Sequence, residues 1–303
     1  MISYDLCFPW NWEHDADFAM LLDKACRSHG LSLLQITPDN VVDMLQSLVN
    51  DRMTFRAFFD RASDTDARFV PLARWARDHA VYRINPHERA ARTWDKATMH
   101  LTLISAGLYT PYTIILPSYM EQPALLPMDL SLLGDSFTIK PAHGGGGEGV
   151  VTEATSLSQV LVARQEYPAD KYLLQAHILP AQLDPRPAWF RVIYCTGQVH
   201  PCWWDTCTHA YTPVTPVEES HHGLTPLRDI TTSIARICGL ELFSTEIALT
   251  PDGLFVVVDY VNDQLDLRLQ SKAFDGVPDD VVRSIAERLV ALVAARRPFQ
   301  LYL

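Results

Sequence analysis

The chain has 303 residues, of which 48% are hydrophobic and 20% are charged, and its formal net charge is −11. This composition is typical of a globular protein whose length allows two or three subdomains around a sizeable core. The negative charge argues against nucleic-acid binding and against attachment to an anionic membrane surface, because both need a basic surface.

No apolar run reaches the roughly 20 residues that a membrane-spanning helix needs. The opening stretch MISYDLCFPWNWEHD lacks the basic start and the apolar centre of a signal peptide. The six cysteines show no framework spacing, so we expect reduced thiols. These features together predict a cytoplasmic protein without nucleic-acid or membrane partners.

Strands and helices alternate in the first part of the chain, and the first helix ends at a glycine, Gly30. The expected strands are 1–9, 31–36, 54–61 and 81–85, and the expected helices are 15–30, 38–50 and 66–80. Such alternation favours a parallel α/β sheet. No G-x-G-x-x-G motif follows the first strand, so the sequence predicts no dinucleotide site there.

The second part is richer in antiparallel signals. Two hairpins are expected, 189–205 with a turn at Thr196-Gly197 and 243–263 with a turn at Asp252-Gly253. The other expected elements are a helix from 93 to about Gly107, a strand up to 116, a strand that ends at Lys140, a helix over 156–167, a strand over 171–179 and helices over 226–239 and 279–297. This part therefore has α+β character.

The stretch KPAHGGGGEGV, residues 140–150, holds five of the 13 glycines. A glycine-rich loop lets backbone N–H groups approach phosphate oxygens without a side chain in the way. Lys140 precedes the glycines, whereas the lysine of a Walker A motif follows them, so we expect a hairpin loop that closes over phosphates. The alternative is a flexible linker, but linkers mix in serine and do not sit between two apolar strands.

Carboxylates on the last hairpin form a candidate metal site. Glu246 and Asp259 lie six residues from Asp252 and Gly253 respectively, which predicts that they face each other across the hairpin. A carboxylate among apolar neighbours is costly unless a cation or partner compensates it, and oxygen ligands suit Mg²⁺. The alternative is an acid at a strand end that is capped by backbone amides.

A second candidate metal site is the segment HPCWWDTCTH. His200, Cys202, Cys207 and His209 could bind zinc, but the spacing is tight and the segment has the pattern of a strand that runs into a loop. We favour core positions for the cysteines. The residues expected to line a pocket near the phosphates are Trp203, Trp204 and Asp205.

The order of these motifs resembles the ATP-grasp superfamily over about residues 90–297, and within it the carboxylate–amine ligases such as glutathione synthetase and the ligases that add glutamate to a ribosomal-protein tail. The resemblance implies an ATP-grasp fold behind a Rossmann-like α/β domain. The implied domains are 1–90 (pre-ATP-grasp), 91–180 (central, with the glycine-rich loop) and 181–303 (C-terminal, with the metal site).

The resemblance also implies a nucleotide site. DKATMHLTLISAGLYTPYT is similar to the family's first phosphate-lysine segment, which points to Lys96, and FTIKPAHGGGGEGV is similar to the second, which points to Lys140. The implied phosphate loop comprises His143, Gly144, Gly145, Gly146, Gly147 and Gly149.

YLLQAHIL resembles the adenine hinge, with backbone contacts from Gln175, Ala176 and Ile178. The family commonly has an acid in this hinge, and Ala176 is not one, so the ribose contact would fall to Asp184. WFRVIYCTGQV resembles a D-x-R-V strand, which makes Arg191, together with Lys140, an expected catalytic residue.

STEIALTPDGLFVVVDYVND resembles the metal hairpin and implies Glu246, Asp259 and Asn262 as the Mg²⁺ ligands. Asp259 stands where the family has glutamate, and Asn262 follows it after three residues instead of two. A β-bulge would restore the geometry. Without a bulge, Asp263 would take the place of Asn262.

The implied activity is that of an ATP- and Mg²⁺-dependent ligase that joins a carboxylate to an amine through an acyl phosphate. Alternatives are an ATP-grasp small-molecule kinase and a catalytically silent ATP-binding protein. We expect small-molecule or peptide substrates, and a homodimer is possible. The residues expected to set specificity are Trp203, Trp204, Asp205, His209, Tyr211, Arg268 and the loop 217–226.

Overall fold

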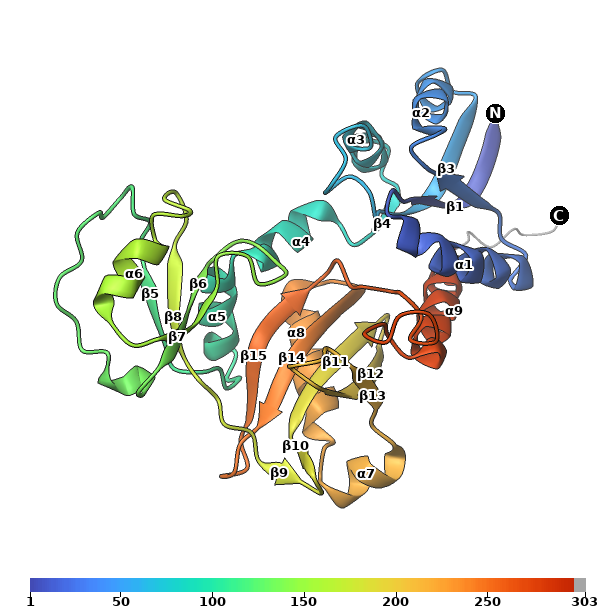
Figure 1. Cartoon of the computed structure of the whole chain (residues 1–303). Coiled ribbons are helices and arrows are strands. Elements are labelled where there is room, and N and C mark those ends of the chain that lie inside the picture. Colours follow the sequence, from blue (N-terminus) through green and yellow to red (C-terminus); the bar gives the residue numbers. More distant parts are fainter. Residues whose placement is uncertain (297–303) are drawn as a thin grey trace.

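The computed structural model describes residues 1–296, which form three larger sheets and one two-stranded sheet with helices around them (Figure 1). The first sheet is parallel and has the strand order β2-β1-β3-β4. Its elements are β1 (Ile2–Pro9), α1 (Ala16–Ser28), β2 (Leu33–Ile36), α2 (Val41–Val49), β3 (Met53–Phe59), α3 (Val70–Asp78) and β4 (Tyr82–Ile84). The expected alternation of strands and helices is confirmed, and the first helix ends at Ser28, two residues before Gly30.

The second sheet is antiparallel, with the order β5-β8-β6-β7. Its elements are α4 (His87–Trp94), α5 (Lys96–Ser105), β5 (Thr113–Leu116), β6 (Phe137–Pro141), β7 (Val151–Ala154), α6 (Leu157–Ala163) and β8 (Tyr172–Ala176). Helix α4 is an addition to the predicted elements. It ends at Trp94, and the extended backbone of Asp95 separates α4 from α5.

The third sheet is antiparallel, with the order β13-β12-β11-β14-β15. Its strands are β11 (Trp189–Cys195), β12 (Gln198–Trp204), β13 (Tyr211–Pro213), β14 (Leu242–Leu249) and β15 (Phe255–Asn262). Both predicted hairpins are confirmed as β11–β12 and β14–β15. The remaining elements are the short pair β9 (Gln182–Leu183) and β10 (Arg186–Pro187), and the helices α7 (Pro216–His221), α8 (Pro226–Cys238) and α9 (Asp279–Ala295).

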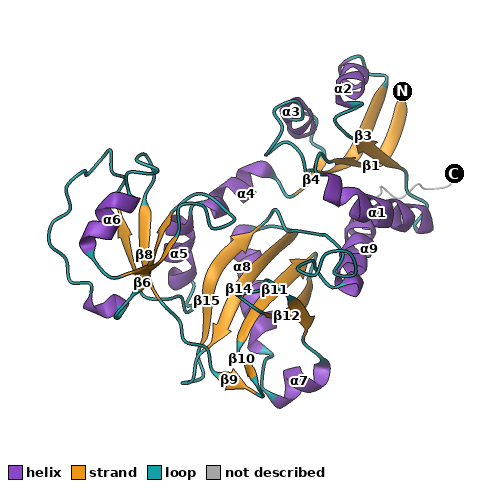
Figure 2. Ribbon diagram, in the orientation of Figure 1, coloured by secondary structure: helices purple, strands orange, loops and turns teal. Residues whose placement is uncertain are grey.

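Helices cover both faces of the third sheet. Trp203 and Phe190 face a core that includes Leu227 and Ile234 of α8. The opposite face shares a core with α9 and with the first sheet, in which Ile193 and Trp204 pack in the same cluster as Phe8 and Leu289. Figures 1 and 2 show α9 lying beside α1, between the first and third sheets.

The last helix therefore joins the amino-terminal part to the third sheet. It was predicted over 279–297, and residue 297, like the rest of the segment 297–303, lies outside the described residues.

Within residues 1–296, no helix is both long and apolar enough to cross a membrane. All six cysteines are free thiols, as expected.

Candidate active site

A cavity of about 790 Å³ lies between the glycine-rich loop of the second sheet and strand β15 of the third. A smaller cavity of about 190 Å³ adjoins it and reaches Lys140. The predicted site residues that line one or both are Lys96, Lys140, His143, Gly144, Gly145, Gly146, Gly147, Arg191, Asp259 and Asn262. The fold thus brings both lysines, the glycine loop and two of the three expected metal ligands to one place.

The glycine loop, residues 142–150, joins β6 to β7 and lies open to the cavity. Gly144, Gly146 and Gly147 have φ values of 109°, 63° and 82°, which only glycine adopts readily. No atom lies within 4 Å of the position that a Cβ would take at any of the three. The loop is therefore a cradle of backbone without side chains, as a phosphate site requires.

Gly149 differs from the other glycines of the loop. A Cβ built there would lie 2.6 Å from Cε2 of Tyr167, and its φ is 68°. It lines neither cavity, so this glycine permits close packing at the base of the loop. His143 also holds the base, because its backbone N–H and its Nδ1 contact the Asp170 carboxylate at 2.8 and 2.9 Å.

Lys96 is positioned by the start of α5. Asp95 caps the helix by accepting hydrogen bonds from the N–H groups of Ala97 and Thr98. The backbone N–H of Lys96 donates to the carbonyl of Ala142 at 2.9 Å, and its Nζ donates to the carbonyl of Gly144. The ammonium group therefore lies directly beside the glycine loop.

Lys140, the penultimate residue of β6, is buried and lies with its Nζ 5.6 Å from the centre of the Tyr260 ring. Burial lowers the pKa of this lysine, and Lys96 adds to the shift, whereas Asp259 and Glu246 oppose it. A desolvated cation beside an open glycine loop attracts phosphate more strongly than a solvated one does.

The predicted pairing of Glu246 with Asp259 is confirmed, and the register of β14 with β15 is irregular on both sides of this pair. Ser244 pairs with Asn262, so β15 has one more residue than β14 between the two pairs. This bulge turns Asn262 toward Asp259, to which its Nδ2 donates a 2.8 Å hydrogen bond.

Asp263, the alternative third ligand, has a different partner. Its Oδ1 accepts a 2.8 Å hydrogen bond from Nε1 of Trp94, and burial raises its pKa. It lines the larger cavity as well. The side chain that contacts Asp259 is nevertheless Asn262, as the predicted bulge requires.

Burial and the nearby Asp259 raise the pKa of Glu246, although Arg191 and Trp189 counteract them. Burial would also raise the pKa of Asp259, but Lys140 and the amide of Asn262 bring it below its usual value. The pair therefore concentrates negative charge in a poorly solvated place. Two adjacent carboxylates in such a place are expected to attract a cation.

Arg191 lies on β11 directly opposite Glu246. Its Nη1 donates to Oε1 of Glu246 at 3.1 Å, and its Nε donates to the hydroxyl of Ser244 at 3.3 Å. The guanidinium carbon lies 4.9 Å from the centre of the Trp204 ring. These contacts fix the guanidinium group at the wall of the larger cavity.

The residues of the predicted adenine hinge lie at the end of β8. The Gln175 side chain is buried and donates to the hydroxyls of Thr113 and Tyr260. The N–H of Ala176 donates to the carbonyl of Tyr112 at 2.9 Å, so this donor is engaged within the protein. Gln175, Ala176 and Ile178 are absent from the lining of the two cavities described above.

Asp184, the expected ribose contact, is placed elsewhere. It follows β9, and its carboxylate lies within 4.8 Å of ring nitrogens of both His221 and His222 at the end of α7. It lines neither cavity. The structure therefore brings Asp184 to α7 and not to the lysines and the glycine loop.

Two of the expected specificity residues, Trp203 and Trp204, lie on opposite faces of β12. Trp204 faces Arg191, and His209 stacks on it with ring centres 5.4 Å apart. Trp203 was expected near the phosphates, but this prediction is wrong. It packs against Phe190 on the opposite face, because neighbouring residues of a strand point to opposite sides of the sheet.

The zinc site considered for the segment HPCWWDTCTH does not form within the described residues. Cys202 is buried in the core shared with α9, as favoured from the sequence, whereas Cys207 is exposed. His209 stacks on Trp204, and His200 lies 3.5 Å from Ser284 of α9. In the part of the chain that the structure describes, these four side chains do not form a metal-binding group.

Several residues that line the larger cavity lie outside the motifs recognised in the sequence. Residues that line the larger cavity but were not predicted from the sequence are Asp64, Thr65, Thr93, Gln264 and Asp266. Asp64 and Thr65 follow β3, at the carboxyl edge of the parallel sheet, where ligands commonly bind. That rule could have identified Asp64 and Thr65 from the sequence.

No protein-family model matches the sequence, and no curated protein sequence matches it significantly. Solved structures do match over nearly the whole chain. A RimK-domain ATP-grasp protein from Sphaerobacter thermophilus is 19% identical, with a TM-score of 0.62 and coverage of 95% of this chain and 99% of that one.

Two further structures are 12% identical to this chain. One is a D-alanine–D-alanine ligase from Bacillus anthracis complexed with ATP, with a TM-score of 0.61 and 97% of both chains covered. The other is the ATP-grasp ligase PsnB complexed with a minimal precursor, Mg and ADP, with a TM-score of 0.60 and coverage of 97% and 99%. The chain therefore has the ATP-grasp fold.

Proposed function

We propose that this protein is an ATP-dependent ligase that joins a carboxylate to an amine through an acyl phosphate. The observation that carries the proposal is the convergence of Lys96, Lys140, the glycine loop and the Asp259–Asn262 pair on two adjoining cavities. Cations, open backbone amides and carboxylates are the groups that a phosphoryl-transfer site needs.

Lys96, Lys140 and the loop from His143 to Gly147 would hold the phosphates of ATP. Both lysines lie beside the loop, and the glycines expose backbone without side chains. Backbone groups near Ala176 and Ile178 would pair with adenine, and the engaged N–H of Ala176 leaves this task to the other backbone groups there. Asp184 as the ribose contact remains a prediction from the resemblance.

The donor set of β14 and β15 fits Mg²⁺. Glu246 and Asp259 pair across the two strands and Asn262 contacts Asp259, so three side chains with oxygen donors come from neighbouring positions of one hairpin. These residues would hold the ion, which when bound neutralises phosphate charge. Arg191 already contacts Glu246, so its guanidinium group lies next to the same place.

The proposed chemistry has two steps. A carboxylate oxygen of the first substrate attacks the γ-phosphorus, and the bond to the oxygen of the departing ADP breaks. The amine nitrogen of the second substrate then attacks the acyl carbon and loses a proton as inorganic phosphate leaves. Arg191 would bind the acyl phosphate through its planar fork, and Lys140 would stabilise the charge on the moving phosphoryl group.

Phosphate release from Mg²⁺-ATP across a matrix of carboxylates and amines tests this proposal, with mass spectrometry of the products. A product that contains both substrates minus one water, formed with ADP and phosphate, would support it. A phosphorylated alcohol formed with ADP would instead identify a kinase. The absence of Mg²⁺-ATP binding would overturn every ATP-dependent function.

A further inference from the structure

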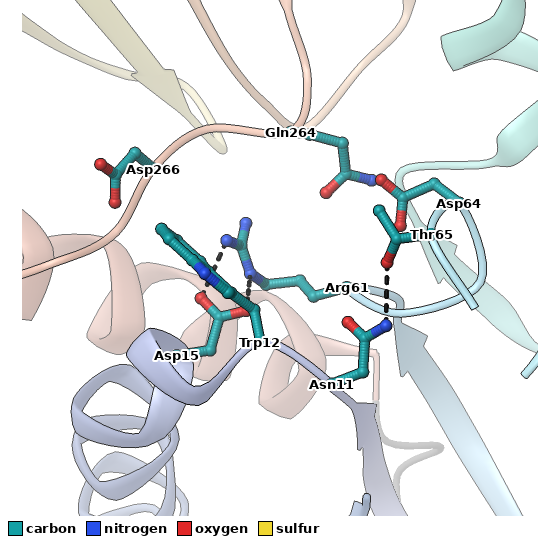
Figure 3. A pocket seen from close by; sticks show the side chains of 8 residues that line it. All are labelled: Asn11, Trp12, Asp15, Arg61, Asp64, Thr65, Gln264 and Asp266. Carbon is teal, nitrogen blue, oxygen red and sulfur yellow. Dashed lines mark hydrogen bonds and ion pairs between the residues drawn. The ribbon is translucent and has the colours of Figure 1, made fainter. Parts of the chain in front are cut away.

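A third cavity, of about 440 Å³, lies between the first sheet and the chain that follows β15. We name it the junction pocket, and Figure 3 shows its eight labelled side chains. Asp64, Thr65, Gln264 and Asp266 line both this pocket and the larger cavity described above, so the two adjoin. Its volume is in the range of pockets that hold small ligands.

The floor of the junction pocket is a buried ion pair. Arg61 and Asp15 are 8% and 1% exposed, and they contact each other through Nε to Oδ2 at 2.9 Å and Nη2 to Oδ1 at 2.8 Å. The remaining Nη1 donates to the carbonyl of Leu265 at 2.9 Å. Each of the three guanidinium nitrogens therefore has a partner within the protein, and the charge of Arg61 is compensated by Asp15.

The rim of the pocket is acidic. Asp64 has no hydrogen bond or ion pair within residues 1–296, and Figure 3 shows the Gln264 side chain pointing toward it. Asp266 pairs with Arg268, and the same arginine also pairs with Asp275. Carboxylates thus outnumber cations around the pocket, which gives it a negative potential.

An aromatic side chain completes the wall. Trp12 is 40% exposed and stands beside the buried ion pair (Figure 3). The guanidinium carbon of Arg268 already lies 5.8 Å from the centre of its ring, so Trp12 takes part in a cation–π contact within the protein. Trp12 and Asp64 line the same pocket, which therefore offers an exposed indole for an apolar stem and a carboxylate for a cation.

We propose that the junction pocket binds a guanidinium or ammonium group at the non-reacting end of a substrate. Asp64 would pair with this cation, Trp12 would contact its stem, and the reacting group would extend into the larger cavity toward Arg191. The inference rests on the proposed ligase function for the identity of the ligand as a substrate. The charge preference of the pocket rests only on its own side chains.

Calorimetric titration of the intact protein without nucleotide tests the charge preference. The probes are 4-guanidinobutyrate and its neutral isostere 4-ureidobutyrate, which differ in charge and little in shape. We expect the guanidino compound to bind at least about tenfold more tightly. Equal affinities, tighter binding of the ureido compound, or no binding of either at millimolar concentration would overturn the proposal.

Substitutions of Asp64 test whether this residue causes the preference for the guanidino compound. Asp64→Asn should remove the tenfold difference, and Asp64→Glu should restore part of it. Because Asp64 is exposed and has no hydrogen-bonded partner in the described chain, neither variant is expected to unfold the protein. Asp280→Asn, which changes an exposed carboxylate on α9 outside the pocket, is the matched control and should keep the difference. A preference that persists in Asp64→Asn would overturn the assignment.

Probe affinity and Mg²⁺-ATP turnover, measured on the same protein, distinguish failure of this inference from failure of the proposed function. Preference for the guanidino probe in a protein that shows no Mg²⁺-ATP turnover would retain the cation pocket and overturn the ligase. ATP turnover without any preference between the two probes would retain the ligase and overturn the cation pocket.

Discussion

The side-chain amide of Asn262 donates a 2.8 Å hydrogen bond to Oδ2 of Asp259, although the two residues lie three positions apart on one strand. In a regular strand, residues three apart point to opposite faces. The bulge in β15 between these two residues removes this mismatch. The bulge thus brings the two side chains together despite the three-residue spacing.

Asp259→Asn should lower ATP turnover at least 100-fold and leave weak nucleotide binding. The change removes the more acidic carboxylate of the pair with little change in shape, and electrostatic groups at a phosphoryl-transfer site are typically worth this much. Steady-state phosphate release and nucleotide titration measure the two effects. Asp229→Asn on the exposed face of α8 is the control, and undiminished turnover in Asp259→Asn would remove the proposed metal site.

Lys140→Met should weaken Mg²⁺-ATP binding at least about tenfold. Methionine keeps much of the volume at this buried position but removes the desolvated charge beside the loop. Nucleotide affinity is measured by calorimetry, and thermal unfolding confirms that the variant is folded. Lys24→Met on the exposed face of α1 should bind ATP like the parent protein. Equal affinity in Lys140→Met would mean that the phosphates bind elsewhere.

The pairing of Glu246 with Asp259 was predicted correctly, but for an incomplete reason. The prediction assumed a two-residue turn at Asp252-Gly253, whereas Leu249 pairs with Phe255 around a longer turn. A regular ladder from that turn would place Val258 opposite Glu246. A bulge next to Glu246 shifts the register by one residue, and no sequence signal marks its position.

The junction pocket could not be predicted from the sequence, because it forms between loops that are far apart along the chain. Arg61 hydrogen-bonds Leu265, which lies 204 residues further along the chain. Local patterns predict elements and short hairpins, but they do not specify which loop of one sheet meets which loop of another. The opposite orientations of Trp203 and Trp204, in contrast, follow from strand periodicity and could have been read from the sequence.

Gly149→Ala should destabilise the folded protein by about 1–3 kcal/mol, because it adds a Cβ at positive φ and 2.6 Å from Tyr167. Gly145→Ala is the matched control in the same loop. Gly145 does not have a positive φ, and no atom lies within 4 Å of the position for its Cβ, so little change is expected. Denaturant unfolding measures both variants, and equal stabilities would contradict the packing role of Gly149.

The glycine loop should exchange its amide hydrogens faster without nucleotide than with it. The segment from Gly144 to Glu148 is exposed, and glycines lose the most conformational freedom on ordering. Phosphate contacts to the backbone would compensate for that loss. Hydrogen exchange measured by mass spectrometry with and without Mg²⁺-ATP should show protection over residues 143–149. Unchanged exchange at saturating nucleotide would exclude direct phosphate contacts by the loop.

The final prediction concerns His100, whose Nδ1 lies 2.7 Å from the Tyr260 hydroxyl in a buried network. That hydroxyl accepts a hydrogen bond from Gln175, so its own hydrogen is free to be donated to a neutral His100. Burial, with a contribution from Lys140, lowers the pKa of His100 from 6.5 to about 4. The folded state therefore favours the neutral imidazole.

Stability should consequently fall as the pH falls through this window. Above pH 6.5 the histidine is neutral in both states, and below it the unfolded chain binds a proton that the folded protein resists until about pH 4. Between pH 6.5 and 5 this linkage is worth about 2 kcal/mol at most. Urea unfolding at pH 7.5 and 5.0 should show a smaller acid-induced loss in His100→Gln, whose amide oxygen can accept the Tyr260 hydrogen but does not titrate. His200, whose pKa is also lowered by burial, is left unchanged by the substitution, so its contribution should cancel in the comparison. Identical losses in the two proteins would contradict a buried neutral imidazole at His100.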